Sequence, residues 1–145
     1  MTQHIFPYGI RFQEDGRIEV FPALEISLLG PKGDGLRLLL HIDSGATTSI
    51  LPESDAENLK ISKKNGKKML VRGITGSPLT GYRQLVRIQL GTITLKIPVI
   101  FVAENAIPRI LGREGVFSKF GILFDEAKRR TAFLNDRTRI NSFLQ

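Results

Sequence analysis

Alternation of apolar and polar residues predicts the longest strands of this chain. Ile93, Leu95, Ile97, Val99 and Phe101 put five apolar side chains on one face of an extended segment. Such a face is typical of a strand that covers a core. Gly91-Thr92 precedes this segment and predicts a turn from an earlier strand at 82–90.

A β-hairpin is predicted in the first third of the chain. Apolar positions between Ile18 and Leu28 indicate a strand that Pro22 interrupts or bends, because proline cannot donate to a strand ladder. The turn-forming run 30–35 then closes the hairpin onto a second strand at 36–42. The hairpin therefore presents Asp43 at its far end.

Shorter elements follow the hairpin. We expect a strand at 47–51 and a short helix at 52–59, where proline and acidic residues suit a first helical turn. Residues 60–68 hold five lysines and an Asn-Gly pair, and we interpret them as a solvated hairpin tip.

A glycine-rich segment at 73–81 separates two strands predicted at 69–72 and 82–90. Its three glycines permit a hairpin whose backbone approaches an extended ligand closely. An ordinary glycine-rich loop is the alternative. The remaining predictions are strands at 107–111, 122–124 and 131–134 and a single short helix at 115–120.

The two ends of the chain are less regular. Residues 1–18 are interpreted as an N-terminal extended arm or irregular lead-in, and 19–134 as the domain. Residues 135–145 form a C-terminal tail, in which 140–144 are expected to be a strand at a dimer interface.

Composition limits the chemistry that the chain can perform. The 145 residues suffice for one domain with a real core. The chain has no cysteine, and its only histidines are His4 and His41, so neither a zinc finger nor a cysteine nucleophile can be built. No cofactor or metal is expected. No signal peptide and no apolar run of about eighteen residues is found, so we expect a cytoplasmic protein with no membrane contact.

The net charge of +7 favours acidic partners without locating a site. No aromatic residue is interleaved with the lysines at 60–68, so stacking on bases is not provided for. We therefore expect nucleic acid to bind weakly and only electrostatically.

Asp43 is the strongest candidate for chemistry. The apolar run 38–42 delivers Asp43, Ser44 and Gly45 into a turn, and a carboxylate at the end of a buried strand is costly unless it is paired, hydrogen-bonded or functional. A structural Asx or Ser turn is the simpler alternative.

A resemblance adds to this reading. Asp43-Ser44-Gly45-Ala46 after a hydrophobic strand resembles the active-site loop of the retropepsin-like aspartic proteases, and 107–121, with Ile110-Leu111-Gly112-Arg113, is similar to a second segment of that family. The resemblance covers about 19–134. It implies an all-β fold with one or two short helices, a closed β-barrel with one lobe per chain. The implied roles are Asp43 as catalytic residue, Ser44, Gly45 and Ala46 as support of its loop, Gly73, Ile74, Thr75 and Gly76 as a substrate-binding flap, and Leu111, Gly112 and Arg113 as structural residues near the site.

The expected mechanism is hydrolysis of peptide bonds by a pair of carboxyl groups. Two adjacent carboxyl groups share one proton and so supply an acid and a base at once. Asp-Ser/Thr-Gly occurs once in this chain, so the second group must be Asp43 of another subunit. We therefore expect a homodimer that acts on peptide or protein substrates.

Three positions depart from the family pattern or need comment. Thr47 stands where viral members commonly carry an acid, so Arg113 must find another partner, and Glu114 replaces the usual aspartate. His41 should point to the same side as Asp43. We interpret it as a core or rim residue, and electrostatic tuning of the acid pair is the alternative.

Three other functions share single features with this one. A subtilisin-type serine protease also carries Ile-Asp-Ser-Gly, but its other triad motifs are missing and the chain is too short. A non-catalytic peptide-binding or assembly module of the same fold remains an alternative. A basic nucleic-acid-binding β domain is a third reading that net charge alone supports.

Overall fold

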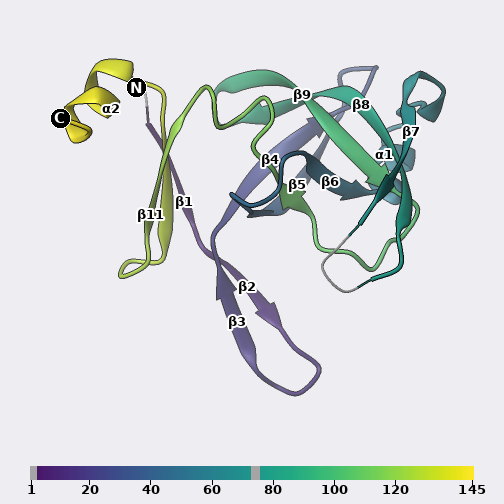
Figure 1. Ribbon diagram of the computed structural model, residues 1–145, viewed down its shortest axis with the longest axis horizontal. Helices are drawn as coiled ribbons and strands as arrows, with labels where there is room; N and C mark the ends of the chain where they lie inside the picture. Colours follow the sequence, from purple (N-terminus) through teal and green to yellow (C-terminus); the bar gives the residue numbers. More distant parts are fainter. Residues whose placement is uncertain (1–2, 73–75) are drawn as a thin grey trace.

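The centre of the molecule is a closed barrel of six strands (Figure 1). The computed structural model describes residues 3–72 and 76–145. Around the barrel, each strand pairs with the next, and β4 and β8 close the ring through the pairs Ser27↔Gln89 to Leu29↔Arg87. The order is β4 (Ala23–Leu29), β5 (Gly35–Ile42), β10 (Ile110–Leu111), β6 (Ser49–Pro52), β9 (Ile93–Val102) and β8 (Leu79–Leu90). The expected all-β closed barrel is thus confirmed.

Three further elements surround the barrel. Strand β7 (Lys67–Val71) continues the sheet beyond β8, with which it pairs in antiparallel fashion. Helix α1 (Glu53–Asn58) follows β6, and a 3-10 helix, η1 (Lys63–Asn65), precedes β7. The expected helix at 52–59 is confirmed, whereas the expected hairpin tip at 60–68 is wrong, because η1 and the start of β7 occupy that segment.

The core fills the barrel with the apolar positions that the alternation predicted. On β9, Leu95, Ile97, Val99 and Phe101 are buried and Ile93 is half-buried at the edge. On the neighbouring β8, Val86, Ile88 and Leu90 point to the same interior. Burial of these side chains is the main source of stability in such a fold.

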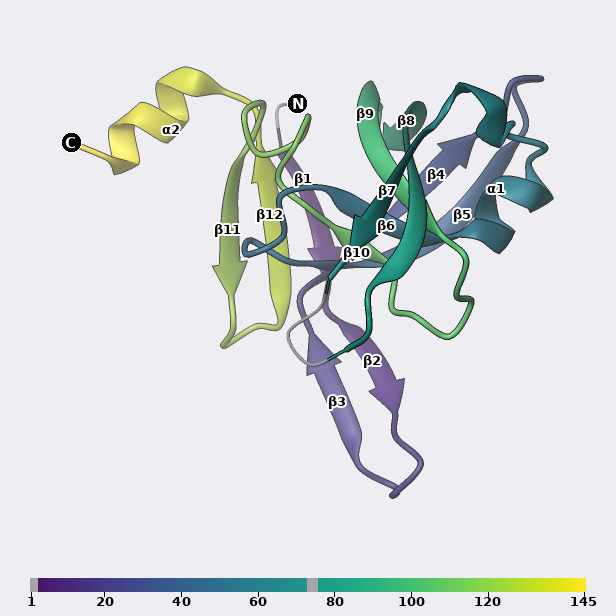
Figure 2. The same cartoon turned by 45° about the vertical axis from the view of Figure 1, so that its right-hand side comes forward.

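The N-terminal segment is more regular than expected. β1 (Gln3–Pro7) pairs with β12 (Arg130–Leu134), which pairs with β11 (Gly121–Asp125) in a three-stranded sheet beside the barrel (Figure 2). β2 (Gly9–Phe12) and β3 (Ile18–Phe21) form a separate hairpin. An irregular lead-in over residues 3–12 is therefore wrong. β1 has its hydrogen-bond partner in β12, near the other end of the chain, and β2 has its partner in β3, after an intervening turn.

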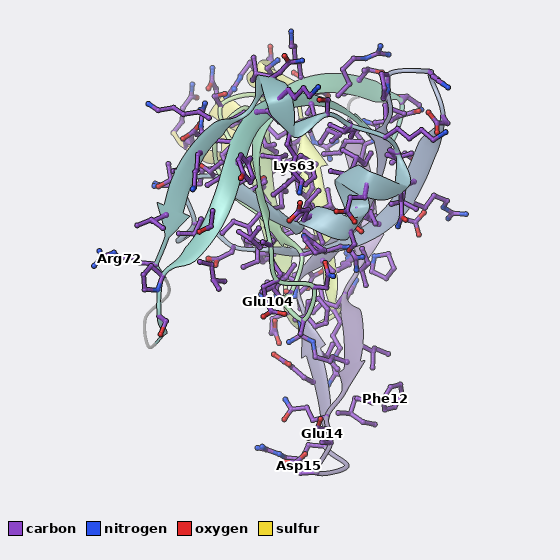
Figure 3. All side chains as sticks on the ribbon, turned by 90° about the vertical axis from the view of Figure 1, so that its right-hand side faces the viewer. Phe12, Glu14, Asp15, Lys63, Arg72 and Glu104 are labelled. Atoms are coloured by element: carbon purple, nitrogen blue, oxygen red, sulfur yellow. The ribbon has the colours of Figure 1, made fainter. Side chains whose placement is uncertain are left out.

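The β2–β3 hairpin projects from the body of the molecule in all three views, and Figure 3 places Phe12, Glu14 and Asp15 toward its tip. Ile10 faces Val20 and Phe12 faces Ile18 across the ladder, so these four side chains share one face. Ile10, Phe12 and Ile18 are more than half exposed. The interruption at Pro22 between β3 and β4 is as predicted.

Two predictions near the C-terminus are wrong. Residues 115–120 form consecutive turns, with the Phe117 N–H donating to the Arg113 carbonyl, and no regular helix. The tail forms helix α2 (Arg137–Phe143) where a strand was expected over 140–144. The carboxylate of Asp136 accepts a hydrogen bond from the Arg139 N–H at 3.2 Å and so caps the first turn of this helix.

Candidate active site

Asp43 lies directly after β5, at the edge of the barrel where β10 runs parallel to β5. The His41 N–H donates to the Arg109 carbonyl at 2.8 Å, and the Asp43 N–H donates to the Leu111 carbonyl at 3.0 Å. The ladder between the two strands therefore extends through the backbone of Asp43. The carboxylate is held at the end of a strand that buries one face, directly after the apolar run that the sequence singled out.

A tight turn orients the Asp43 side chain. The Gly45 N–H donates to Asp43 Oδ1 at 2.9 Å, and the Ala46 N–H donates to the Asp43 carbonyl at 3.2 Å. A side chain on residue 45 would meet this same Oδ1, since a Cβ there would lie 3.2 Å from it. Asp43 is half-buried, whereas Ser44 and Gly45 are exposed, so the turn presents the carboxylate at the surface of the chain.

The two segments singled out in the sequence meet at this turn. The Arg113 N–H donates to the Ala46 carbonyl at 3.0 Å, and the Glu114 N–H donates to the Thr47 carbonyl at 2.8 Å. These backbone bonds join residues that are more than sixty positions apart in the chain. The backbone from Leu111 to Glu114 is therefore hydrogen-bonded to the Asp43 turn and to the residues that follow it.

Gly112 is needed because two backbones come close together. A Cβ at this position would lie 2.5 Å from the Thr48 carbonyl carbon and 2.9 Å from the Ser49 nitrogen. Its N–H donates to Ser49 Oγ at 2.9 Å, and Ser49 is fully buried. The buried hydroxyl thereby gives the Gly112 N–H a partner away from water.

Arg113 contacts the residue at the expected position, although that residue is a threonine, so the expectation of a different partner is wrong. Its Nη2 donates to Thr47 Oγ1 at 3.4 Å, a long hydrogen bond between exposed groups. Thr47 thus takes the place of the acid that its position commonly carries in viral members of the family that the sequence resembles. A neutral hydroxyl holds the guanidinium less strongly than a carboxylate would.

Glu114 forms a link that sequence reasoning missed. It accepts hydrogen bonds from Arg83 Nη2 on β8 at 2.8 Å and from Thr48 Oγ1 at 3.0 Å. The Arg83 bond is the main reason that the pKa of Glu114 is lowered, and partial burial opposes this shift. No sequence signal identifies Arg83, because outward-facing cations are ordinary on a strand.

A partly buried ion pair between α1 and the residue before β10 was also missed. Asp55 on α1 is 1% exposed and receives two hydrogen bonds from Arg109, at 2.7 and 2.8 Å. Arg109 immediately precedes β10, and its carbonyl holds His41. The sequence suggested only that acids suit the first turn of α1, since the partner is 54 residues away.

His41 packs against its neighbours at the rim of the barrel. Its ring stacks on Phe21 with centroids 4.9 Å apart and an interplanar angle of 16°, and Arg11 lies over the same Phe21 ring at 5.1 Å. His41 is half-buried. These contacts fit the reading of a rim histidine.

A groove of about 460 Å³ lies beside His41. It is lined by Arg11 and Phe21 of the β2–β3 hairpin, by Leu39 and by residues 106–109.

The predicted flap lies between β7 and β8, whose ladder ends at the pair Val71↔Leu79. The two strands that should carry a flap are therefore confirmed. Gly73, Ile74 and Thr75 lie outside the described residues. Gly76, the last of the four flap candidates, is exposed.

The family is established by the sequence over more than half of the chain. The Aspartyl protease family model matches residues 32–115, a range that contains both segments described above. The chain therefore belongs to the aspartyl protease family, as the resemblance indicated. No match was found among curated proteins.

Solved structures agree on the fold. A retropepsin-like aspartic protease from Rickettsia conorii is similar with a TM-score of 0.56 at 16% identity, over 90% of this chain and 89% of that chain. The retroviral protease-like domain of Ddi1 from Leishmania major is similar with a TM-score of 0.52 at 15% identity, over 80% of this chain and 97% of that chain. The fold of this chain is thus retropepsin-like.

No helix within residues 3–72 and 76–145 is long and apolar enough to cross a membrane.

Proposed function

We propose that this protein is an aspartic endopeptidase that acts as a homodimer. The observation that carries the proposal is the placement of the half-buried Asp43 at the end of β5, where the Gly45 N–H orients its carboxylate. The exposure of Ser44 and Gly45 leaves room for the same turn of a second chain and for a substrate. Membership in the aspartyl protease family supports the choice of reaction.

The second carboxyl group comes from the partner subunit in this proposal. Asp-Ser/Thr-Gly occurs once in the chain, and no hydrogen bond joins Asp43 to another carboxyl group within the described residues. A two-fold axis beside the turn would bring two copies of Asp43 together. Two carboxyl groups in such proximity cannot both ionise, so they hold one proton between them.

The shared proton supplies both halves of the reaction. The ionised Asp43 takes a proton from a water molecule while the water oxygen attacks the scissile carbonyl carbon, and the protonated Asp43 donates to the carbonyl oxygen. A tetrahedral diol results. The carboxyl group that took the proton of water then donates it to the amide nitrogen, while the other, now ionised, takes a proton from a hydroxyl of the diol. The C–N bond breaks, an amine and a carboxylic acid are released, and the pair again holds one proton.

The substrate would bind as an extended strand over the Asp43 turn. Gly45 has no side chain to obstruct the scissile bond, and the flap residues Gly73, Ile74, Thr75 and Gly76 would bind the substrate backbone from the other side. The groove beside His41 offers apolar surface from Phe21, Leu39 and Ile107 to a substrate side chain. Selectivity for apolar residues near the cleavage site would follow.

Cleavage of a mixed peptide library by the purified protein tests the proposal. Wild type should produce defined cleavage products at acidic to neutral pH, and Asp43→Asn should reduce the rate by roughly a thousandfold or more, because an amide cannot accept the proton of water. Asparagine keeps the oxygen that Gly45 contacts, so circular dichroism should show an unchanged fold. Cleavage retained in a clean Asp43→Asn preparation would refute the mechanism, and no cleavage by wild type would favour the non-catalytic peptide-binding module.

A further inference from the structure

A basic groove lies on the outer side of β8. Its volume is about 620 Å³, and its walls come from the end of β4, the loop after α1, and strands β7, β8 and β9. Lys63, which Figure 3 labels, lies on η1 between the lining residues Ser62 and Asn65. Five cations line the basic groove, namely Lys60, Lys67, Arg83, Arg87 and Lys96.

The charges of the basic groove are of one sign. No aspartate or glutamate is among its lining residues. Arg83 is paired with Glu114, but no ion pair is formed by Lys60, Lys67, Arg87 or Lys96 with any residue that the structure describes. A groove lined by uncompensated charge of one sign attracts ligands of the opposite sign.

The register of the sheet makes this arrangement unfavourable in the free protein. Lys67 lies directly opposite Arg83, and Arg87 lies directly opposite Lys96. Like charges at directly opposed positions of an antiparallel pair destabilise the pairing. An anionic ligand would remove this repulsion, so the fold itself favours occupation of the groove by negative charge.

The remaining surface of the groove identifies the kind of anion. Leu85, which is 56% exposed, lies between Arg83 and Arg87 on the outward face of β8, and Pro31 adds further apolar surface. No aromatic side chain lines the groove, so nucleic acid bases have no ring on which to stack. Apolar surface between cations matches a peptide in which apolar and acidic side chains are mixed.

We propose that the basic groove binds an acidic peptide segment of a partner protein, with carboxylates on the cations and an apolar side chain on Leu85. If the protein is a protease, the segment would belong to its substrates and would hold them through contacts other than those at the cleavage site. That second step rests on the proposed function, whereas the binding itself does not.

Fluorescence anisotropy with a labelled peptide that mixes glutamate and leucine tests the binding. The protein should carry Asp43→Asn, so that failure to bind and failure to hydrolyse are separate results. A peptide with glutamine at every glutamate position controls for charge, and a single-stranded oligonucleotide of equal charge tests for nucleic acid. Binding of the acidic peptide should weaken as salt is raised, since screening acts on exposed charges.

Charge reversal at the opposed pair separates binding from folding. Lys96→Glu and Arg87→Glu each replace a repulsive pair by an attractive one, so each should raise the melting temperature slightly while it weakens peptide binding by roughly tenfold. Lys119→Glu changes the net charge equally at an exposed position outside the groove and should leave the affinity unchanged. The proposal would be overturned by equal affinity for the acidic and the glutamine peptide, or by unchanged affinity in both reversal variants. Tighter binding of the oligonucleotide would overturn it as well.

Discussion

Arg83 donates a hydrogen bond of 2.8 Å to Glu114 and so joins strand β8 to the segment that supports the Asp43 turn. Glu114 also accepts from Thr48 and donates its own N–H to Thr47, in the residues that follow Asp43. One residue, through its side chain and its backbone, therefore connects the strand that follows the predicted flap with the residues after Asp43. This link uses glutamate, which reaches further than the aspartate usual at its position in the family.

We predict that Glu114→Gln lowers stability above pH 5 and removes part of its dependence on acid. The pKa of Glu114 is lowered in the folded chain, so its stabilisation is complete above the ordinary value of about 4.5 and is lost as pH falls through the lowered pKa. Both side chains of the ion pair are more than one third exposed, which limits the effect to about 1 kcal/mol. Urea denaturation at several pH values measures it.

Glu14→Gln is the matched control for this series, since Glu14 is exposed in the turn of the β2–β3 hairpin and forms no ion pair that the described chain shows. Its stability curve should follow that of wild type. Carboxyl groups titrate between about pH 3 and about pH 6. If the free energy of unfolding of wild type and of Glu114→Gln changes in parallel over that range, the predicted role of Glu114 is contradicted.

We predict that Gly112→Ala destabilises the protein by about 2 to 3 kcal/mol, the usual cost of inserting atoms where there is no room. The added Cβ would lie 2.5 Å from the backbone of Thr48, directly before β6, and backbone cannot move aside as a flexible side chain can. Thermal and urea denaturation measure the loss. Gly35→Ala, where the nearest atom would be 3.5 Å away, is the control and should change little. Equal stability of the two variants would argue against the close approach.

We predict that removing Arg109 and removing Asp55 from their partly buried ion pair lower stability by unequal amounts. Arg109→Leu should cost about 3 kcal/mol or more, because it leaves the carboxylate of Asp55 buried without a partner. Asp55→Asn should cost less, about 1 to 2 kcal/mol, because the Arg109 side chain is 38% exposed and can turn toward water. The double variant should lose less free energy of unfolding than the sum of the losses in the two single variants. Additive losses in urea denaturation would show that the pair is not coupled.

We predict that excess Asp43→Asn chain suppresses the activity of wild type beyond simple dilution. Co-folding should place most wild-type chains in heterodimers, which hold only one ionisable carboxyl group at the site and cannot share a proton in the required way. Peptide cleavage at a fixed amount of wild type and rising amounts of variant measures the effect. Activity strictly proportional to wild-type chain, or a fully active species that sediments as a monomer, would show that one chain suffices.

The sequence by itself determined the parts of this protein that depend on neighbouring residues. The alternation at 93–101, the turn formers at 30–35 and the break at Pro22 predicted strands that the structure confirms, because each is governed by local backbone preferences and by one buried face. The position of Asp43 after an apolar run was enough to single out the turn that the structure places at the end of β5.

Only the tertiary structure decided which distant segments meet. β1 became a strand because β12, more than 120 residues later, supplies its hydrogen-bond partners, whereas the tail became helix α2, begun by the cap at Asp136. The contacts of Glu114 with Arg83 and of Asp55 with Arg109 join side chains 31 and 54 residues apart. Side chains of opposite charge occur throughout the sequence, so charge alone does not say which pairs form. The closure of the barrel sets that choice, because it fixes which strands, and therefore which residues, stand side by side.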